Sequence, residues 1–127
     1  VWVLVTPELN ALLSAPRRRI IVDADGATLT AGDSGAIISN LGASGAAPFV
    51  LPPATLGLEF TFVVEVAQEL RIDPDGTETV ALPDTGVQQA AGKYITANAI
   101  GERIHLVCIT AGTWDALYSA GTWTVEG

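Results

Sequence analysis

One serine motif and one histidine are the residues with the clearest capacity for catalysis. Residues 32–35 read GDSG, the motif in which a large class of serine proteases holds its nucleophile, here Ser34. Those enzymes place the histidine before the serine along the chain, whereas the single histidine of this chain, His105, follows it. We therefore interpret GDSG as a tight turn whose polar side chains bond their own backbone. The chain is predicted not to be an enzyme.

Two aspartate pairs could bind a cation. Residues 23–26 read DADG and residues 73–76 read DPDG. An EF-hand loop requires glutamate six residues after its glycine, but these positions hold Gly32 and Leu82. Hairpin turns explain both segments. A zinc site also lacks ligands, because the chain has one histidine and one cysteine. We expect no metal and no cofactor.

Two features leave carbohydrate chemistry open. The glutamates of the central region could supply a pair for glycoside hydrolysis, although solvation on a polar strand face also explains them. The motif AGTW occurs at residues 111–114 and again at 120–123. Its two tryptophans could stack on sugar rings, but their identical turn context favours packing at strand starts. We interpret the repeat as one hairpin.

Composition excludes several classes of function. The net charge is −8, which argues against a nucleic-acid partner because such binders carry basic faces. No apolar run reaches the ~18 residues of a membrane span. Charged residues make up only 16% of the chain, against about 25% in globular proteins. A surface so poor in charge is typical of a protein that covers part of itself with other chains.

Short runs of β-forming residues, separated by turn residues, fill the chain after Arg19. Residues 58–66 alternate apolar and polar side chains, which indicates a strand with one face in the core. A second such run covers residues 102–110. We expect one core to contain the following side chains: Leu58, Phe60, Phe62, Val64, Ile104, Leu106 and Cys108.

The first 19 residues have a different pattern. Thr6, Pro7 and the following glutamate are typical of a helix start, and Leu9, Leu12 and Leu13 would share one face of that helix. Residues 1–19 are therefore predicted to form an arm with a short helix. The arm either docks on a partner or caps its own domain. The partner-binding candidates are Trp2, Leu9, Leu12, Leu13, Arg17, Arg18 and Arg19.

Three stretches carry a resemblance to a known group of proteins. They read GDSGAIISNLGASGAAPFVLP, GLEFTFVVEVAQELRIDPDG and GERIHLVCITAGTWDALYSAGTW. Residues 31–127, which contain them, resemble small β-rich modules of tailed-phage and prophage structural proteins. With the strand pattern, this predicts an all-β domain over residues 20–127, a jelly-roll-like sandwich of about 8–10 short antiparallel strands.

The resemblance implies a structural role on the virion surface. We expect a non-enzymatic capsid decoration (cement) protein that bridges subunits of the major capsid protein. It would act as a homo-oligomer, a trimer, with no nucleic-acid or membrane contact. A tail-fibre or tailspike receptor-binding module is the alternative within virions. A carbohydrate-binding domain or a glycosidase fragment is the alternative from another class.

Overall fold

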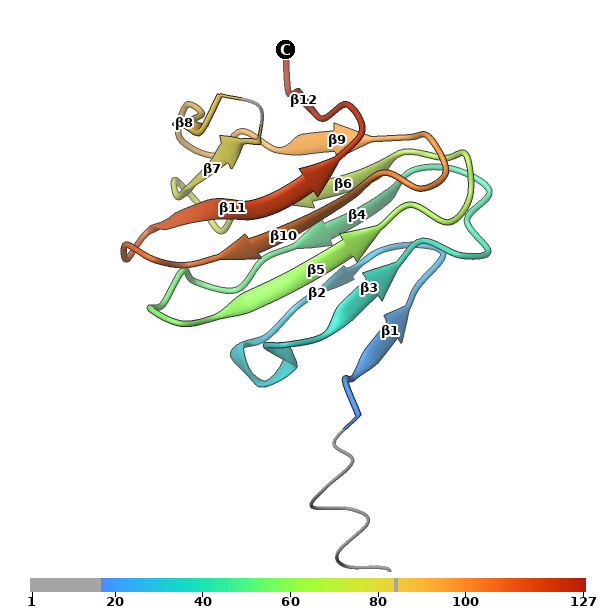
Figure 1. Ribbon diagram of the computed structural model, residues 1–127, viewed down its shortest axis with the longest axis horizontal. Coiled ribbons are helices and arrows are strands. Elements are labelled where there is room, and N and C mark those ends of the chain that lie inside the picture. Colours follow the sequence, from blue (N-terminus) through green and yellow to red (C-terminus); the bar gives the residue numbers. More distant parts are fainter. Residues whose placement is uncertain (1–16, 84) are drawn as a thin grey trace, which may run out of the picture.

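The computed structural model describes residues 17–83 and 85–127, and these residues form two β-sheets (Figure 1). The seven-stranded sheet has the spatial order β1 (Ile20–Val22), β3 (Ile37–Ser39), β5 (Glu59–Val63), β10 (Arg103–Val107), β11 (Thr113–Ala120), β7 (Thr79–Leu82) and β8 (Val87–Gln88). The five-stranded sheet has the order β12 (Thr124–Val125), β9 (Ile95–Ala97), β6 (Leu70–Asp73), β4 (Ala47–Val50) and β2 (Ala27–Thr28). The all-β prediction is confirmed.

The two runs that were predicted as strands, residues 58–66 and 102–110, contain β5 and β10, and each strand is shorter than its run. Among the described residues, one 3-10 turn occupies Ala31–Asp33. No helix in the described part of the chain is long and apolar enough to cross a membrane. The predicted N-terminal helix lies outside the described residues.

The first six strands alternate between the two sheets. β1, β3 and β5 pair in the larger sheet, while β2, β4 and β6 pair in the smaller one, and all four of these pairings are parallel. After each of these strands the chain crosses to the opposite sheet, and it crosses back after the next strand. Each strand therefore runs in the same direction as the previous strand of its own sheet, and the two pair in parallel. The prediction of an antiparallel domain is therefore wrong for this half of the chain. β5, β10 and β11 pair antiparallel, as do β6, β9 and β12.

The Asp25-Gly26 pair was expected to close a hairpin, and this prediction is wrong. The strands that it connects, β1 and β2, lie in different sheets. Gly26 has φ +81°, and a Cβ there would lie 2.0 Å from the carbonyl oxygen of Pro48. Glycine is therefore needed both for the backbone conformation and for the close approach of the two chain segments.

The AGTW repeat is likewise not one hairpin, because β11 and β12 lie in different sheets. Each glycine of the repeat has a positive φ, +84° at Gly112 and +86° at Gly121. Each turn is followed by a buried tryptophan, Trp114 at 0% exposure and Trp123 at 3%. The expectation that the tryptophans pack in the interior is confirmed.

One hydrophobic core fills the space between the sheets. Phe49 of β4 contacts Phe62 of β5 with ring centroids 5.9 Å apart, and Phe60 lies 5.7 Å from Trp114. Tilted aromatic pairs at these distances are favourable beyond the area that they bury. Six of the seven predicted core residues are buried, and Leu58 packs at the margin of the core.

Two buried polar side chains at the end of β3, Ser39 and Asn40, hold the loop that follows β5. Asn40 accepts a hydrogen bond from the backbone N–H of Glu65 at 2.8 Å and donates one to the carbonyl of Gln68 at 3.1 Å. Ser39 donates a hydrogen bond to the Glu65 carboxylate. Because buried polar groups are costly when unpaired, these bonds fix the loop after β5 against the end of β3.

Glu102 performs a similar task in the turn before β10, where its backbone pairs with that of Val64, directly after β5. Its carboxylate accepts hydrogen bonds from the backbone N–H groups of Asn98 and Ala99, at 3.0 and 2.8 Å, and from that of Thr122. Burial raises the pKa of Glu102, but the N–H groups of Ala99, Thr122 and Asn98 together outweigh it, so the pKa lies below its usual value. A Cβ on Gly121 would lie 2.4 Å from the Glu102 side chain.

The Phe62→Ala variant tests the register of the central strand. Removing a fully buried ring should lower the free energy of unfolding by about 3–5 kcal/mol. The measurement is chemical denaturation of the isolated protein, with Val63→Ala on the opposite face of β5 as the control. A loss below about 1 kcal/mol would show that the ring does not lie in the core, since a slip of one residue reverses both faces of a strand.

The Glu102→Gln variant tests the carboxylate clamp. At neutral pH it should destabilise the protein by about 1–3 kcal/mol, because a buried N–H loses its acceptor. The folded-state pKa lies below the unfolded value of about 4.3. The stabilisation by the carboxylate is thus complete above that value and is lost as the pH falls through the folded-state pKa. Denaturation between acidic and neutral pH, with Asp75→Asn as the control, should show the gap between wild type and variant closing only in acid.

Candidate functional site

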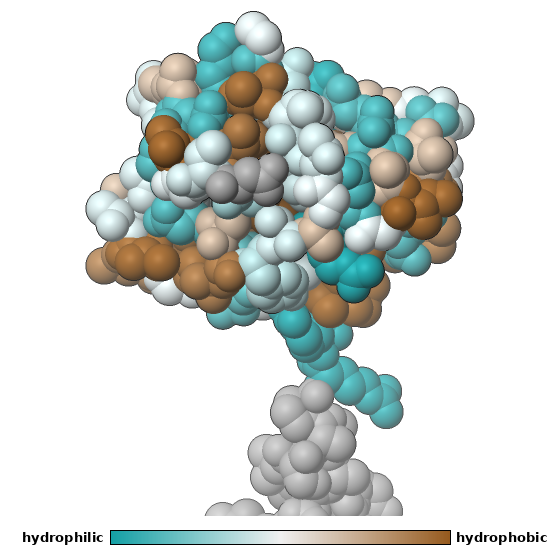
Figure 2. All heavy atoms as spheres, turned by 45° about the horizontal axis from the view of Figure 1, so that its top comes forward, coloured by the Kyte–Doolittle hydropathy of each residue, from teal (hydrophilic) through white to brown (hydrophobic). Residues whose placement is uncertain are grey.

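Large apolar side chains are exposed at separate places on the described surface. Figure 2 shows them as brown patches divided by hydrophilic side chains. On the seven-stranded sheet they gather on the edge strand β1 and on β11. Those more than half exposed on these two strands are Ile20 (59%), Val22 (52%), Leu117 (58%) and Tyr118 (51%). Such patches mark candidate contacts with other molecules.

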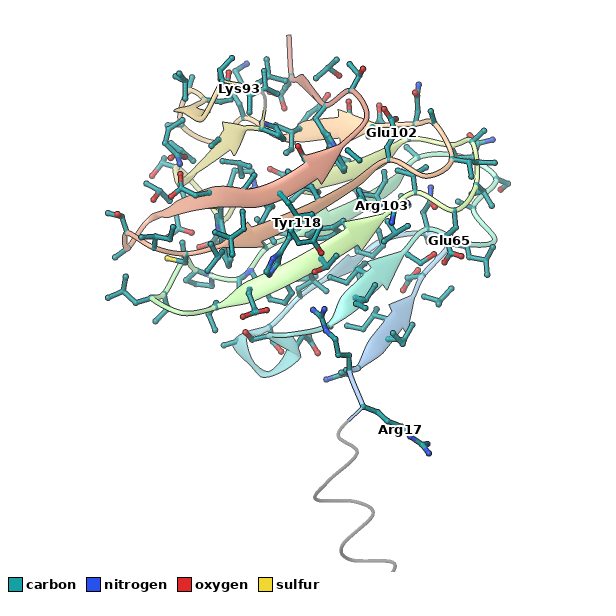
Figure 3. All side chains as sticks on the ribbon, in the orientation of Figure 1. Arg17, Glu65, Lys93, Glu102, Arg103 and Tyr118 are labelled. Carbon is teal, nitrogen blue, oxygen red and sulfur yellow. The ribbon has the colours of Figure 1, made fainter. Side chains whose placement is uncertain are left out.

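The three arginines at the start of β1 have different environments. Arg18 donates two hydrogen bonds to the carbonyl of Gly35, at 3.1 Å from Nε and 3.0 Å from Nη2. Arg19 forms an ion pair with Asp33 at 2.7 Å. Arg17 is exposed and points away from the sheets (Figure 3), and its side chain forms no hydrogen bond or ion pair with the described residues. Arg18 and Arg19 thus fasten the segment to the domain, whereas Arg17 makes no such contact with the described residues.

The other four predicted partner-binding residues lie outside the described residues. They are Trp2, Leu9, Leu12 and Leu13. Arg18 contacts Gly35 and Thr61, and Arg19 contacts Asp33 of the 3-10 turn, so both side chains are attached to the segments that follow them.

A polar group lies at the centre of the outer face of the seven-stranded sheet. Nε2 of His105 lies 3.2 Å from Oε1 of Glu59, and the His105 ring lies 5.2 Å from the ring of Tyr118. Tyr118 is labelled over the middle of this sheet in Figure 3. Ser34 uses its hydroxyl to accept a hydrogen bond from the backbone N–H of Glu59, at 3.1 Å. The segment is a turn, as predicted, and Asp33 bonds the nearby backbone N–H of Thr30, but Ser34 bonds the backbone of β5 and not that of its own turn.

The two aspartate pairs differ in their surroundings. Asp23 accepts a hydrogen bond from the backbone N–H of Asp25 at 2.9 Å, the arrangement of an Asx turn. Asp73 lies on β6, where burial and then the charge of Glu126 raise its pKa. Among the described residues, no group of three or more histidine, cysteine, aspartate or glutamate side chains is arranged to hold a metal.

A polar cleft of about 160 Å³ opens beside β9 and β12. It is lined by Glu69, Thr96, Ala97, Asn98, Glu102, Thr122 and Thr124. Arg71 extends the polar surface nearby: it pairs with Glu69 at 2.7 Å, and its guanidinium lies 4.2 Å from the centroid of the Tyr94 ring. Hydroxyl, amide and carboxylate groups around a small cleft could hold a polar ligand. This cleft could not be predicted from the sequence, because its residues come from segments far apart along the chain.

The side chains with the greatest capacity for stacking or thiol chemistry are inside the core. Trp114 and Trp123 are buried and offer no surface for a sugar ring. Cys108 is 1% exposed, and burial raises the pKa of its thiol. A buried thiol of raised pKa is unreactive.

Comparisons with known proteins do not assign the chain to a family. No protein-family model matches the sequence, and no curated protein matches it.

Proposed function

We propose that this chain is a non-enzymatic structural protein of a phage particle, a capsid decoration protein on the virion surface. An oligomer, for which the resemblance favours three copies, would lie over junctions between subunits of the major capsid protein. Burying apolar area across such a junction raises the free energy needed to separate the shell. The contacts would be with protein and not with nucleic acid or membrane.

The difference between the two outer faces carries this proposal. The seven-stranded sheet exposes apolar side chains on β1 and β11. The outward positions of the five-stranded sheet are mainly polar, among them Thr28, Arg71, Asp73, Thr96 and Thr124. A protein that covers a shell needs one face for the shell and one for water. The apolar face would be the one that attaches.

The arginine segment fits the edge of this attaching face. Arg17 is exposed beside β1, whereas Arg18 and Arg19 bind the sheet. In a chain of net charge −8, a local basic cluster would orient the protein on an acidic neighbour. The preceding residues, with Trp2, Leu9, Leu12 and Leu13, would add apolar contacts as a docking arm.

The jelly-roll-like sandwich is part of the same proposal. Two sheets packed face to face, with the chain passing between them, support it. Jelly rolls are common in virus particles. The parallel pairings of β1 to β6 would make this a variant of that architecture.

A carbohydrate-binding role is the second candidate, and the polar cleft beside β9 and β12 is the observation that favours it. Its threonine hydroxyls and the amide of Asn98 are the groups that hydrogen-bond sugars. In that case the protein would serve as a tail-fibre or tailspike receptor-binding module.

Ser34→Ala and His105→Ala, made together, test the absence of catalysis. We expect the fold to be retained, because neither side chain lies in the core. Attachment to particles is measured with Ser34→Ala alone, because His105 lies on the proposed attaching face beside Tyr118, and it should be unchanged. The measurements are co-sedimentation with particles and an assay for peptide and glycoside hydrolysis. A hydrolytic activity that disappears with Ser34→Ala alone would contradict the proposal.

Labelling of particles tests the proposed location. Antibody or gold label directed at the chain should appear over the capsid shell in electron micrographs, and adding the protein to shells that lack it should raise the temperature at which they break open. Ile20→Lys/Leu117→Lys should weaken attachment, while Thr28→Lys/Thr96→Lys on the polar face should not. Label confined to the tail, or binding to host glycans without binding to shells, would favour the second candidate instead.

A further inference from the structure

The strand β1 is an edge of the larger sheet, and its outer side has no partner among the described residues. The sheet order places β1 at one end, paired only with β3. Natural proteins usually protect such an edge with charges, prolines or bulges, because it can pair with another chain. Here the edge strand consists of Ile20, Ile21 and Val22.

The free backbone groups of this edge belong to Ile20 and Val22. The N–H of Ile37 donates to the carbonyl of Arg19 at 2.9 Å, and the N–H of Asp23 donates to the carbonyl of Ser39 at 3.1 Å. In a β-ladder, alternate residues of a strand bond to the same neighbour. Since the odd-numbered residues bond to β3, the N–H and C=O groups of Ile20 and Val22 point outward from the edge.

The side chains of these two residues are exposed as well. Ile20 is 59% and Val22 52% exposed, while Ile21 between them packs against the core. An antiparallel partner that bonded to Ile20 and Val22 would satisfy their backbone groups. It would also cover both side chains if it presented apolar residues at the facing positions.

A second copy of β1 meets both requirements. In an antiparallel pair centred on Ile21, Ile20 of each copy lies opposite Val22 of the other, and these are the residues with outward backbone groups. The two Ile21 residues then face each other across the symmetry axis. In this register, the exposed side chain of Ile20 lies beside that of Val22 of the other copy on the outer face of the sheet. Apolar side chains therefore meet apolar side chains there.

The charges that flank β1 favour the same arrangement. Arginines occupy positions 17–19 before the strand, and aspartates occupy positions 23 and 25 after it. Antiparallel pairing brings the arginine end of each copy beside the aspartate end of the other. Arg17 and Asp25 are both exposed, and neither side chain forms a hydrogen bond or ion pair with the described residues. A parallel pair would instead place like charges together.

We propose that two copies of this chain pair through β1, antiparallel and about a two-fold axis, so that their seven-stranded sheets become one continuous sheet. The contact does not depend on the virion role proposed above. It produces dimers on its own, and six-copy assemblies when a three-fold contact exists elsewhere on the surface. Because the strand is short, the interface belongs to the small and transient class.

Charge exchange tests the pairing. Arg17→Asp and Asp25→Arg should each weaken self-association of the full chain at least about tenfold, because each places like charges opposite one another. Combining them in one chain restores opposite charges across the two-fold axis, so the double variant should return to within about threefold of the wild-type dissociation constant. Sedimentation equilibrium over a range of concentrations gives these constants. Asp75→Arg, the same charge change at a distant turn, should have no effect beyond that of net charge.

Disulfide crosslinking tests the register. In the double variant Ile20→Cys/Val22→Cys, each new thiol faces a thiol of the other copy at a directly paired position, within bridging distance. Mild oxidation should produce a covalent dimer with twice the 13.1 kDa mass of the chain. Ile20→Cys alone should crosslink poorly, because its equivalent in the other copy is displaced diagonally by two residues. The native Cys108 is buried and does not compete.

Several results would overturn the proposal. One is a protein that is monomeric throughout the concentration range, and another is a trimer with no even-numbered species. A double charge variant as impaired as the single variants would exclude the antiparallel pairing. A dimer that forms without crosslinking of Ile20→Cys/Val22→Cys would show that another segment, such as the apolar residues 1–5 of this chain, covers the edge instead.

Discussion

The contact between the two sheets is the interaction on which the rest of the structure depends. Neither sheet could remain in water alone, because each presents one face of aromatic and aliphatic side chains. Phe49 of one sheet and Phe62 of the other meet in the middle of the core. The need to bury both faces at once explains why the strands alternate so strictly, since a strand that slipped by one residue would remove its side chains from this layer.

Crossing between the sheets has consequences beyond the core. The chain passes from one sheet to the other after each of its first six strands, so β1 and β2 are the edges of their respective sheets. The crossings need tight turns, and at Gly26 the two segments come too close for any side chain. Polar clamps then hold the loops: Asn40 fixes the segment after β5, and Glu102 fixes the turns that enter β10 and β12.

This architecture leaves two unlike outer faces. The outer face of the larger sheet combines exposed apolar side chains with the His105–Glu59 pair, while that of the smaller sheet is dominated by threonines and ion pairs such as Arg71–Glu69. In the proposed role, the first face would attach to the shell and the second would stay exposed to water. The edge strand β1 adds a third surface, from which the backbone N–H and C=O groups of Ile20 and Val22 point outward.

Local alternation and turn chemistry determined much of this protein directly. The period-two run that contains Phe60 and Phe62 predicted the central strand and its buried face. GDSG was correctly interpreted as a turn, although Ser34 bonds the backbone of the distant Glu59 and not that of its own turn. Sheet membership was beyond sequence analysis, because a turn such as Asp25-Gly26 can close a hairpin or cross between layers. The antiparallel prediction and the hairpin at AGTW were wrong for this reason. Likewise, the fastening of Arg18 to the carbonyl of Gly35 and the polar cleft around Glu102 join residues distant in the chain. Only the packing of the two sheets decided these contacts, because tertiary burial selects among local conformations of similar free energy.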